Sequence, residues 1–151
     1  FKDITNLLKN GPVFKRAIDE IARHYSQIKV DAIVSIEARG FIIGSALAYR
    51  LGSGMVPVRK KGKLPLKVYR QAYDLEYGHD EVEVHQDGIM PEQNILIVDD
   101  LIATGGTVEA VVKLIKEMKG NIVGAAFLIE LTELKGREKI KDIPIFSLIK
   151  Y

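Results

Sequence analysis

The stretch NILIVDDLIATGGT, residues 94–107, decides the fold. It opens with a short, largely apolar run rich in β-branched residues, Asn94 to Val98, which predicts a strand buried on both faces of a parallel sheet. Asp99 and Asp100 follow directly, and a small-residue loop comes next. The segment after this loop carries apolar residues at helical spacing. The predicted order is therefore strand, acidic pair, loop and helix.

The loop of this stretch has the chemistry of a phosphate site. A loop that enters a helix offers unpaired backbone N–H groups and the positive end of the helix dipole. Gly105 and Gly106 allow a close approach of the backbone, and Thr104 and Thr107 add hydroxyl donors. The two aspartates would repel a phosphate but suit ribose hydroxyls or a hydrated Mg²⁺. A phosphorylated sugar therefore fits better than a bare anion, and the alternative is an ordinary turn with surface aspartates.

The composition is typical of a soluble globular protein, and we expect one domain over residues 1–151. With 22 basic and 20 acidic residues the net charge is +2, which gives no reason to expect a nucleic-acid or membrane partner. There is no signal-like segment, so a cytoplasmic location is expected. The chain has no cysteine and three scattered histidines, which excludes disulfides and offers no zinc spacing. Oxygen-bound Mg²⁺ remains possible.

Charged residues also follow two other predicted strands. The strand at 32–36 is followed by Glu37-Ala38-Arg39, and the strand at 55–59 ends in the cations Arg59, Lys60 and Lys63. In an open α/β sheet, ligands gather beyond the carboxyl ends of strands, so we expect Arg39 and Asp99 to face one crevice. There the cations can neutralise a diphosphate. The alternatives are a surface role for Arg39 and, for the cations, a solvated face or a nucleic-acid patch.

Residues 66–90 differ from the strand–helix units around them. Two segments with alternating apolar and polar residues flank Tyr77-Gly78-His79-Asp80, which predicts a β-hairpin. We interpret this hairpin as a mobile flap that closes over the crevice and excludes water. The alternative is an ordinary hairpin at the edge of the sheet.

The segment IVDDLIATGGT resembles the phosphoribosyl-diphosphate (PRPP) motif of the type I phosphoribosyltransferases. The likeness continues in FKDIT, EARGF, VRKKGKLP, YDLEYG, LIELTELKGREKI and PIFSLIKY, which resemble the members of this family that act on adenine. The resemblance implies a type I phosphoribosyltransferase fold. That fold has a mostly parallel central sheet flanked by helices, a β-hairpin flap and a small hood that binds the base.

The implied reaction converts adenine and PRPP into AMP and diphosphate, a step of purine salvage. The resemblance implies Mg²⁺ held mainly by PRPP, diphosphate and water with the two aspartates nearby, and it implies a homodimer. One alternative is transfer to hypoxanthine, guanine or xanthine. Another is a PRPP-sensing regulator that binds nucleic acid, but the sequence leaves no helix-turn-helix with a basic stripe for that role.

The resemblance also assigns roles to residues. The loop would hold the 5′-phosphate, the aspartates the ribose hydroxyls, and the cations the diphosphate together with the backbone of Glu37-Ala38, often through a cis peptide bond. Arg39, Leu101 and Leu131 would flank the purine. The implied catalytic residues are Glu76, Arg39 and Tyr77. The implied substrate-binding residues are Asp99, Asp100, Leu101, Ala103, Thr104, Gly105, Gly106, Thr107, Glu37, Ala38, Arg59, Lys60, Lys63 and Leu131.

The sequence starts at Phe1, inside a segment that resembles a structured part of the family. Family members have an additional amino-terminal helix and a Pro-Gly lead-in before this segment, part of which closes over the base. We therefore expect the natural protein to extend further upstream.

Overall fold

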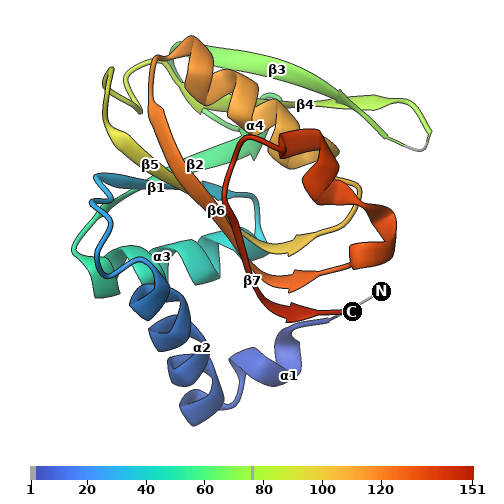
Figure 1. The fold of residues 1–151 in the computed structure, drawn as a ribbon. Coiled ribbons are helices and arrows are strands. Elements are labelled where there is room, and N and C mark those ends of the chain that lie inside the picture. Colours follow the sequence, from blue (N-terminus) through green and yellow to red (C-terminus); the bar gives the residue numbers. More distant parts are fainter. Residues whose placement is uncertain (1–2, 76) are drawn as a thin grey trace.

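The computed structural model describes residues 3–75 and 77–151. Its centre is a seven-stranded sheet in the order β3-β4-β2-β1-β5-β6-β7 (Figure 1). The strands from β2 to β7 in this order run parallel, whereas β4 pairs antiparallel with both β2 and β3. This confirms the mostly parallel α/β sheet. The strands are β1 (Ala32–Ile36), β2 (Gly54–Lys60), β3 (Val68–Asp74), β4 (His79–His85), β5 (Asn94–Ile102), β6 (Asn121–Glu130) and β7 (Ile145–Lys150).

Helices cover both faces of the sheet. In Figure 1, α1, α2 and α3 lie below the sheet and α4 lies above it. The helices are α1 (Thr5–Leu8), α2 (Gly11–His24), α3 (Arg39–Leu51) and α4 (Gly106–Glu117), and two short 3₁₀ helices, η1 (Thr132–Leu134) and η2 (Gly136–Ile140), connect β6 to β7. None of the helices among the described residues is long and apolar enough to cross a membrane.

Burial of the central strand β5 on both faces explains why polar and apolar residues do not alternate in its sequence. Ile95 and Ile97 pack in the core on the α4 side, whereas Leu96 and Val98 pack in the core beneath α2 and α3. All four side chains are inaccessible to solvent. Burial on both faces therefore requires an apolar residue at every position, as the sequence predicts.

β5 is longer than expected. The sequence predicts an end at Val98, but the strand continues to Ile102, so Asp99 and Asp100 lie within it. The reason is the neighbouring strand β6, whose Ile129 pairs with Leu101. Backbone pairing thus extends past the point where the side chains become charged.

β3 and β4 form the expected hairpin, and its base is part of the sheet. Arg59 and Lys60 of β2 pair with Glu83 and Val82 of β4, and Val82 is buried in the α4-side core. Figure 1 shows the far end of the hairpin reaching beyond the rest of the sheet. The edge-hairpin alternative therefore describes the base, and closure of the tip as a flap stays a prediction.

Candidate functional site

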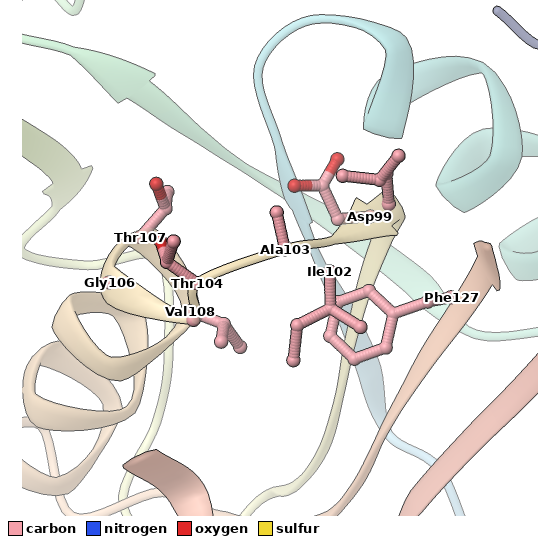
Figure 2. A pocket seen from close by; sticks show the side chains of 10 residues that line it. Asp99, Ile102, Ala103, Thr104, Gly106, Thr107, Val108 and Phe127 are labelled. Atoms are coloured by element: carbon pink, nitrogen blue, oxygen red, sulfur yellow. The ribbon is translucent and has the colours of Figure 1, made fainter. Parts of the chain in front are cut away.

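The site lies where the parallel strands β1, β2, β5 and β6 end at one edge of the sheet. The chain leaves β5, turns at Gly105 with φ of 85°, and starts α4 at Gly106. We call residues 103–107 the phosphate loop. Figure 2 shows Thr104 and Thr107 on one side of a hollow and the ring of Phe127 on another. This hollow has a volume of about 160 Å³ and is lined by Asp99, Leu101, Ile102, Ala103, Thr104, Gly105, Gly106, Thr107, Val108 and Phe127.

The phosphate loop is supported from behind by η2. A Cβ at Gly105 would lie 2.4 Å from the carbonyl oxygen of Gly136, and a Cβ at Gly136 would lie 2.4 Å from that of Ala103. The two backbones therefore touch, which only glycine permits. Sequence reasoning missed Gly136 as a supporting residue, and a single glycine within the charged run at 135–139 was the available signal.

An ion pair with a buried carboxylate connects η2 to the end of β6. Arg137 donates two hydrogen bonds to the carboxylate of Glu130, at 2.7 and 2.6 Å, and Ser147 donates a third at 2.8 Å. The hydrogen bonds from Arg137, offset in part by burial, hold the pKa of Glu130 below its ordinary value. Glu130 is only 3% exposed, so loss of Arg137 would leave a buried carboxylate without its cation.

The two aspartates of β5 have different surroundings. Asp100 is buried, and its Oδ2 accepts a hydrogen bond from Nε of Arg39 at 2.5 Å. Asp99 lies at the floor of the site, where burial and the charge of Asp100 raise its pKa well above the ordinary value. The start of α3 packs close to Asp99, because a Cβ at Gly40 would lie 2.8 Å from its Oδ1. Asp100 thus orients Arg39, and the less buried Asp99 lines the hollow of the phosphate loop.

Residues 59–63, which we call the cation loop, converge on Glu37. Oε1 of Glu37 accepts hydrogen bonds from Nε of Arg59 at 3.2 Å and from the backbone N–H of Lys60 at 3.0 Å, and its Oε2 accepts one from Nζ of Lys63. Burial raises the pKa of Glu37, but the hydrogen bonds and charges of this loop outweigh burial and hold the pKa below its ordinary value. Glu37 is therefore ionised at neutral pH.

A second carboxylate shapes the backbone of the cation loop. Oε1 of Glu83 accepts a hydrogen bond from the N–H of Gly62 at 2.5 Å, and its Oε2 accepts one from Nε of Arg70 at 2.5 Å. Glu83 is 1% exposed and lies in β4 of the hairpin. The hairpin and the cation loop are thus joined through a buried carboxylate.

Two further hollows adjoin the first, and all three share Asp99. One, of about 200 Å³, is lined by Ile36, Glu37, Val58, Arg59, Lys60, Tyr73, Val82, Asp99 and Thr107. The other, of about 240 Å³, is lined by Glu37, Ala38, Arg39, Asp99, Asp100 and Leu101. The peptide bond between Glu37 and Ala38 has the cis form that the family resemblance implies. The structure thus brings most of the expected site residues around one carboxylate.

Some expected residues lie elsewhere. Lys63 reaches the site only through Glu37, and Leu131 packs on the core beneath α2 and α3 without lining any of the three hollows. Tyr77, near the tip of the hairpin, is 88% exposed. Glu76 lies outside the described residues. The catalytic roles of Glu76 and Tyr77 stay predictions.

Two lining residues were missed by sequence reasoning. Tyr73 of β3 lines the hollow that also contains Arg59 and Thr107, and burial together with the charge of Asp80 raises its pKa. Phe127 of β6 pairs in register with Asp99 and lines the first hollow. Both contacts join segments that are distant in sequence. The only available signal was that Tyr73 belongs to YDLEYG.

The described residues include no group of three or more His, Asp or Glu side chains arranged to hold a metal ion by themselves. Asp99 is nevertheless an oxygen donor at the point where the three hollows meet, and oxygen is the ligand that Mg²⁺ prefers. These residues fit a hydrated Mg²⁺ that takes most of its ligands from a bound phosphate compound.

Comparisons with known proteins agree with this geometry. The sequence profile of the phosphoribosyl transferase domain matches residues 3–150. Adenine phosphoribosyltransferase from Acidobacterium capsulatum is 55% identical over 151 residues, which is 100% of this chain and 83% of that protein. The chain belongs to the adenine phosphoribosyltransferase family.

Solved structures of the family superpose over almost the whole chain. The adenine phosphoribosyltransferase of Thermoanaerobacter pseudethanolicus is 48% identical with a TM-score of 0.97, over 100% of this chain and 88% of that one. The enzyme from Saccharomyces cerevisiae, complexed with an imino-altritol bisphosphate and adenine, is 39% identical with a TM-score of 0.92, over 98% and 86% of the two chains. The family fold is thus retained in full along the described chain.

Proposed function

We propose that this protein transfers the 5-phosphoribosyl group from PRPP to adenine, giving AMP and diphosphate. The observation that carries the proposal is the meeting of three hollows at Asp99, one bordered by the phosphate loop, one by the cation loop and one by Arg39. PRPP has a phosphate at one end, a ribose in the middle and a diphosphate at the other. The hollow of the phosphate loop suits the 5′-phosphate, the hollow of the cation loop suits the diphosphate, and Asp99 between them suits the ribose. The hollow of Arg39 is left for the base. The complex of the yeast relative with an imino-altritol bisphosphate and adenine supports a site for a sugar bisphosphate and a purine.

In this reaction the bond from ribose C1 to diphosphate breaks and a bond from C1 to adenine N9 forms. Positive charge develops on the ribose as the diphosphate leaves. The phosphate loop would hold the 5′-phosphate through backbone N–H groups, and Asp99 would face the ribose hydroxyls. Arg59 and Lys60 would neutralise the departing diphosphate. Each residue thus acts on the part of PRPP nearest to it.

The proton on N9 of adenine needs an acceptor as the new bond forms. In our proposal Glu76, carried on the hairpin, accepts or shares this proton when the hairpin closes. Arg39, fixed by Asp100, and Leu101 would border the base. Tyr77 next to Glu76 would help to cover the site, and Leu131 would contact the purine from the end of β6.

Mg²⁺ is proposed as the cofactor, held mainly by PRPP oxygens and water beside Asp99. When bound, it supplies positive charge that stabilises the leaving diphosphate. Arg59 and Lys63 are engaged with Glu37, and Lys60 and Lys61 pair with Asp80 and Glu81, so these cations alone leave much of the diphosphate charge uncompensated. Turnover should therefore stop with excess chelator and return when Mg²⁺ is restored.

A homodimer is proposed as the assembly. Ile42 and Tyr49 lie one heptad apart on α3 and are 44% and 93% exposed, so this helix presents apolar surface. Sedimentation at assay concentrations should show two copies, and a fully active monomer would contradict a role of the partner in the site. The cytoplasmic location expected from the sequence stays a prediction.

The test of the activity is a comparison of bases. Steady-state rates with PRPP and Mg²⁺ should give a much higher kcat/KM for adenine than for hypoxanthine, guanine or xanthine. A preference for a 6-oxopurine would overturn the adenine assignment but keep the transferase. Binding of PRPP without turnover of any base would favour a regulator.

A further inference from the structure

The side chain of Glu37 stands in an unexpected place. The residues expected to bind diphosphate are Arg59, Lys60 and Lys63. They donate to the carboxylate of Glu37 through Nε, the backbone N–H and Nζ respectively. This carboxylate is 8% exposed, whereas the side chains of Arg59 and Lys63 are 36% and 47% exposed. Glu37 therefore already occupies the inner side of the cation loop with an anion.

We propose that Glu37 is an internal competitor of diphosphate, whose carboxylate binds the cation loop when the site is empty and is displaced when the ligand arrives. The inference rests on the proposed function. Glu37 lines the hollow of the cation loop and also the neighbouring hollow of Arg39, so an entering diphosphate meets its negative charge at short range. The ligand must take over donors that Glu37 holds, and it gains only the difference between the two sets of bonds.

The exchange has a consequence for product release. Charge-assisted hydrogen bonds to a multiply charged diphosphate would be strong, and a product held by them would leave slowly. Return of the Glu37 carboxylate to the same donors offsets the loss of these bonds as diphosphate departs. The competitor therefore weakens binding of PRPP and diphosphate at one end of the site. It leaves the hollow of the phosphate loop unaffected, because Glu37 does not line that hollow.

The variant Glu37→Gln tests this inference, because it keeps the shape and an acceptor oxygen but removes the charge. Calorimetric titration should show tighter binding of diphosphate by about tenfold, both with and without Mg²⁺. Binding of AMP, which has no diphosphate, should not change. In turnover assays the inhibition constant of product diphosphate should fall in parallel. Glu37→Ala removes the acceptor altogether and should shift diphosphate binding in the same direction, which keeps the test valid if one variant folds poorly.

Glu81→Gln is the matched control. Glu81 pairs with Lys61 at 3.3 Å and is the register partner of Ala72 in the hairpin, so its substitution makes the same charge change beside the same loop. It lines none of the three hollows, and diphosphate binding should stay within about twofold of the wild type, as for other rim charges.

Two results would overturn the inference. Unchanged or weaker diphosphate binding in Glu37→Gln would mean that the carboxylate positions the cations instead of competing with the ligand. Weaker binding only when Mg²⁺ is present would mean that Glu37 holds a metal-bound water. Either result leaves the proposed function intact if the wild type binds AMP and turns over adenine. Failure of the wild type to bind AMP or diphosphate would overturn both.

Discussion

The phosphate loop and the cation loop are both suited to anions, but they are built in opposite ways. The phosphate loop offers backbone N–H groups and two hydroxyls, and its shape is fixed by contact between Gly105 and Gly136. The cation loop offers side-chain charges, and two carboxylates, Glu37 and Glu83, hold it in place. One depends on geometry and the other on charge.

Because of this difference, we expect the two loops to tolerate different changes. Backbone donors lose their function when a side chain intrudes, and salt affects them little. Side-chain cations tolerate changes in shape, but their attraction for a ligand falls as ionic strength rises. The part of PRPP that stays with the product thus meets a rigid loop, and the part that leaves meets an exchangeable one. The predictions below test this contrast, from the largest expected effect to the smallest.

Gly106→Val should abolish binding of PRPP and AMP while the protein stays folded. A Cβ at Gly106 would meet no protein atom closer than 3.5 Å, so the substitution should fit the fold and fill space that the phosphate needs. Calorimetric titration and thermal melting measure the two effects. Gly11→Val is the control, because Gly11 is the first residue of α2 and its Cβ would have nothing within 4 Å. Normal AMP affinity in Gly106→Val would contradict the assignment of the phosphate loop.

Glu76→Gln should lower kcat by about 10- to 1,000-fold and leave PRPP affinity nearly unchanged, as expected for a proton acceptor that acts mainly in the transition state. Neither anion-binding loop is altered, so this variant separates chemistry from binding. Steady-state kinetics with adenine and a PRPP titration measure the two effects. An unchanged kcat with a raised KM for adenine would make Glu76 a residue that binds the base.

Arg59→Gln should weaken diphosphate binding by about tenfold at low salt, and the difference from the wild type should shrink as salt is added. The same substitution should leave AMP binding unchanged, because Arg59 does not line the hollow of the phosphate loop. Titrations at two ionic strengths measure this. A loss of affinity that salt does not alter would show that Arg59 acts through shape and not through charge.

Glu130→Gln should give the smallest effect, a loss of stability that depends on pH. The pKa of Glu130 is lowered in the folded protein, so its ion pair with Arg137 stabilises the fold above the pKa of an unfolded glutamate, about 4.3. This contribution is lost as pH falls through the lower, folded pKa. The melting temperatures of variant and wild type should therefore differ at pH 7 and converge in acid. The exposed Glu133 provides the control variant Glu133→Gln, and a constant difference across pH would contradict the ion-pair account.

The fold was predictable because its signals are local. The apolar run of β5 and the helical spacing after the phosphate loop each reflect burial that the structure confirms. The predicted end of β5 at Val98 was wrong, because backbone pairing with β6 continues past the charged residues Asp99 and Asp100. The pattern of apolar residues in a sequence reflects which side chains are buried. It does not reflect how far the backbone pairs with a strand that is distant in sequence.

The site was predictable only where its residues lie within one strand–loop–helix unit. Gly136 and Tyr73 reach the site from segments far from residues 94–107, and their neighbourhoods offer only a glycine within a charged run and a place in YDLEYG, neither of which specifies the contact. The pairing of Glu37 with the cation loop was missed for the same reason, because 22 residues separate Glu37 from Arg59. Opposite charges at the ends of two strands show that a ligand site is possible, but they do not show which charges neutralise one another.

The central claim is that two independent loops hold the two ends of PRPP. It is tested most directly by titrating AMP and diphosphate separately into Gly106→Val and Arg59→Gln. The account predicts that Gly106→Val loses AMP binding and keeps diphosphate binding, whereas Arg59→Gln weakens diphosphate binding and keeps AMP binding. Loss of both ligands in both variants would contradict the account.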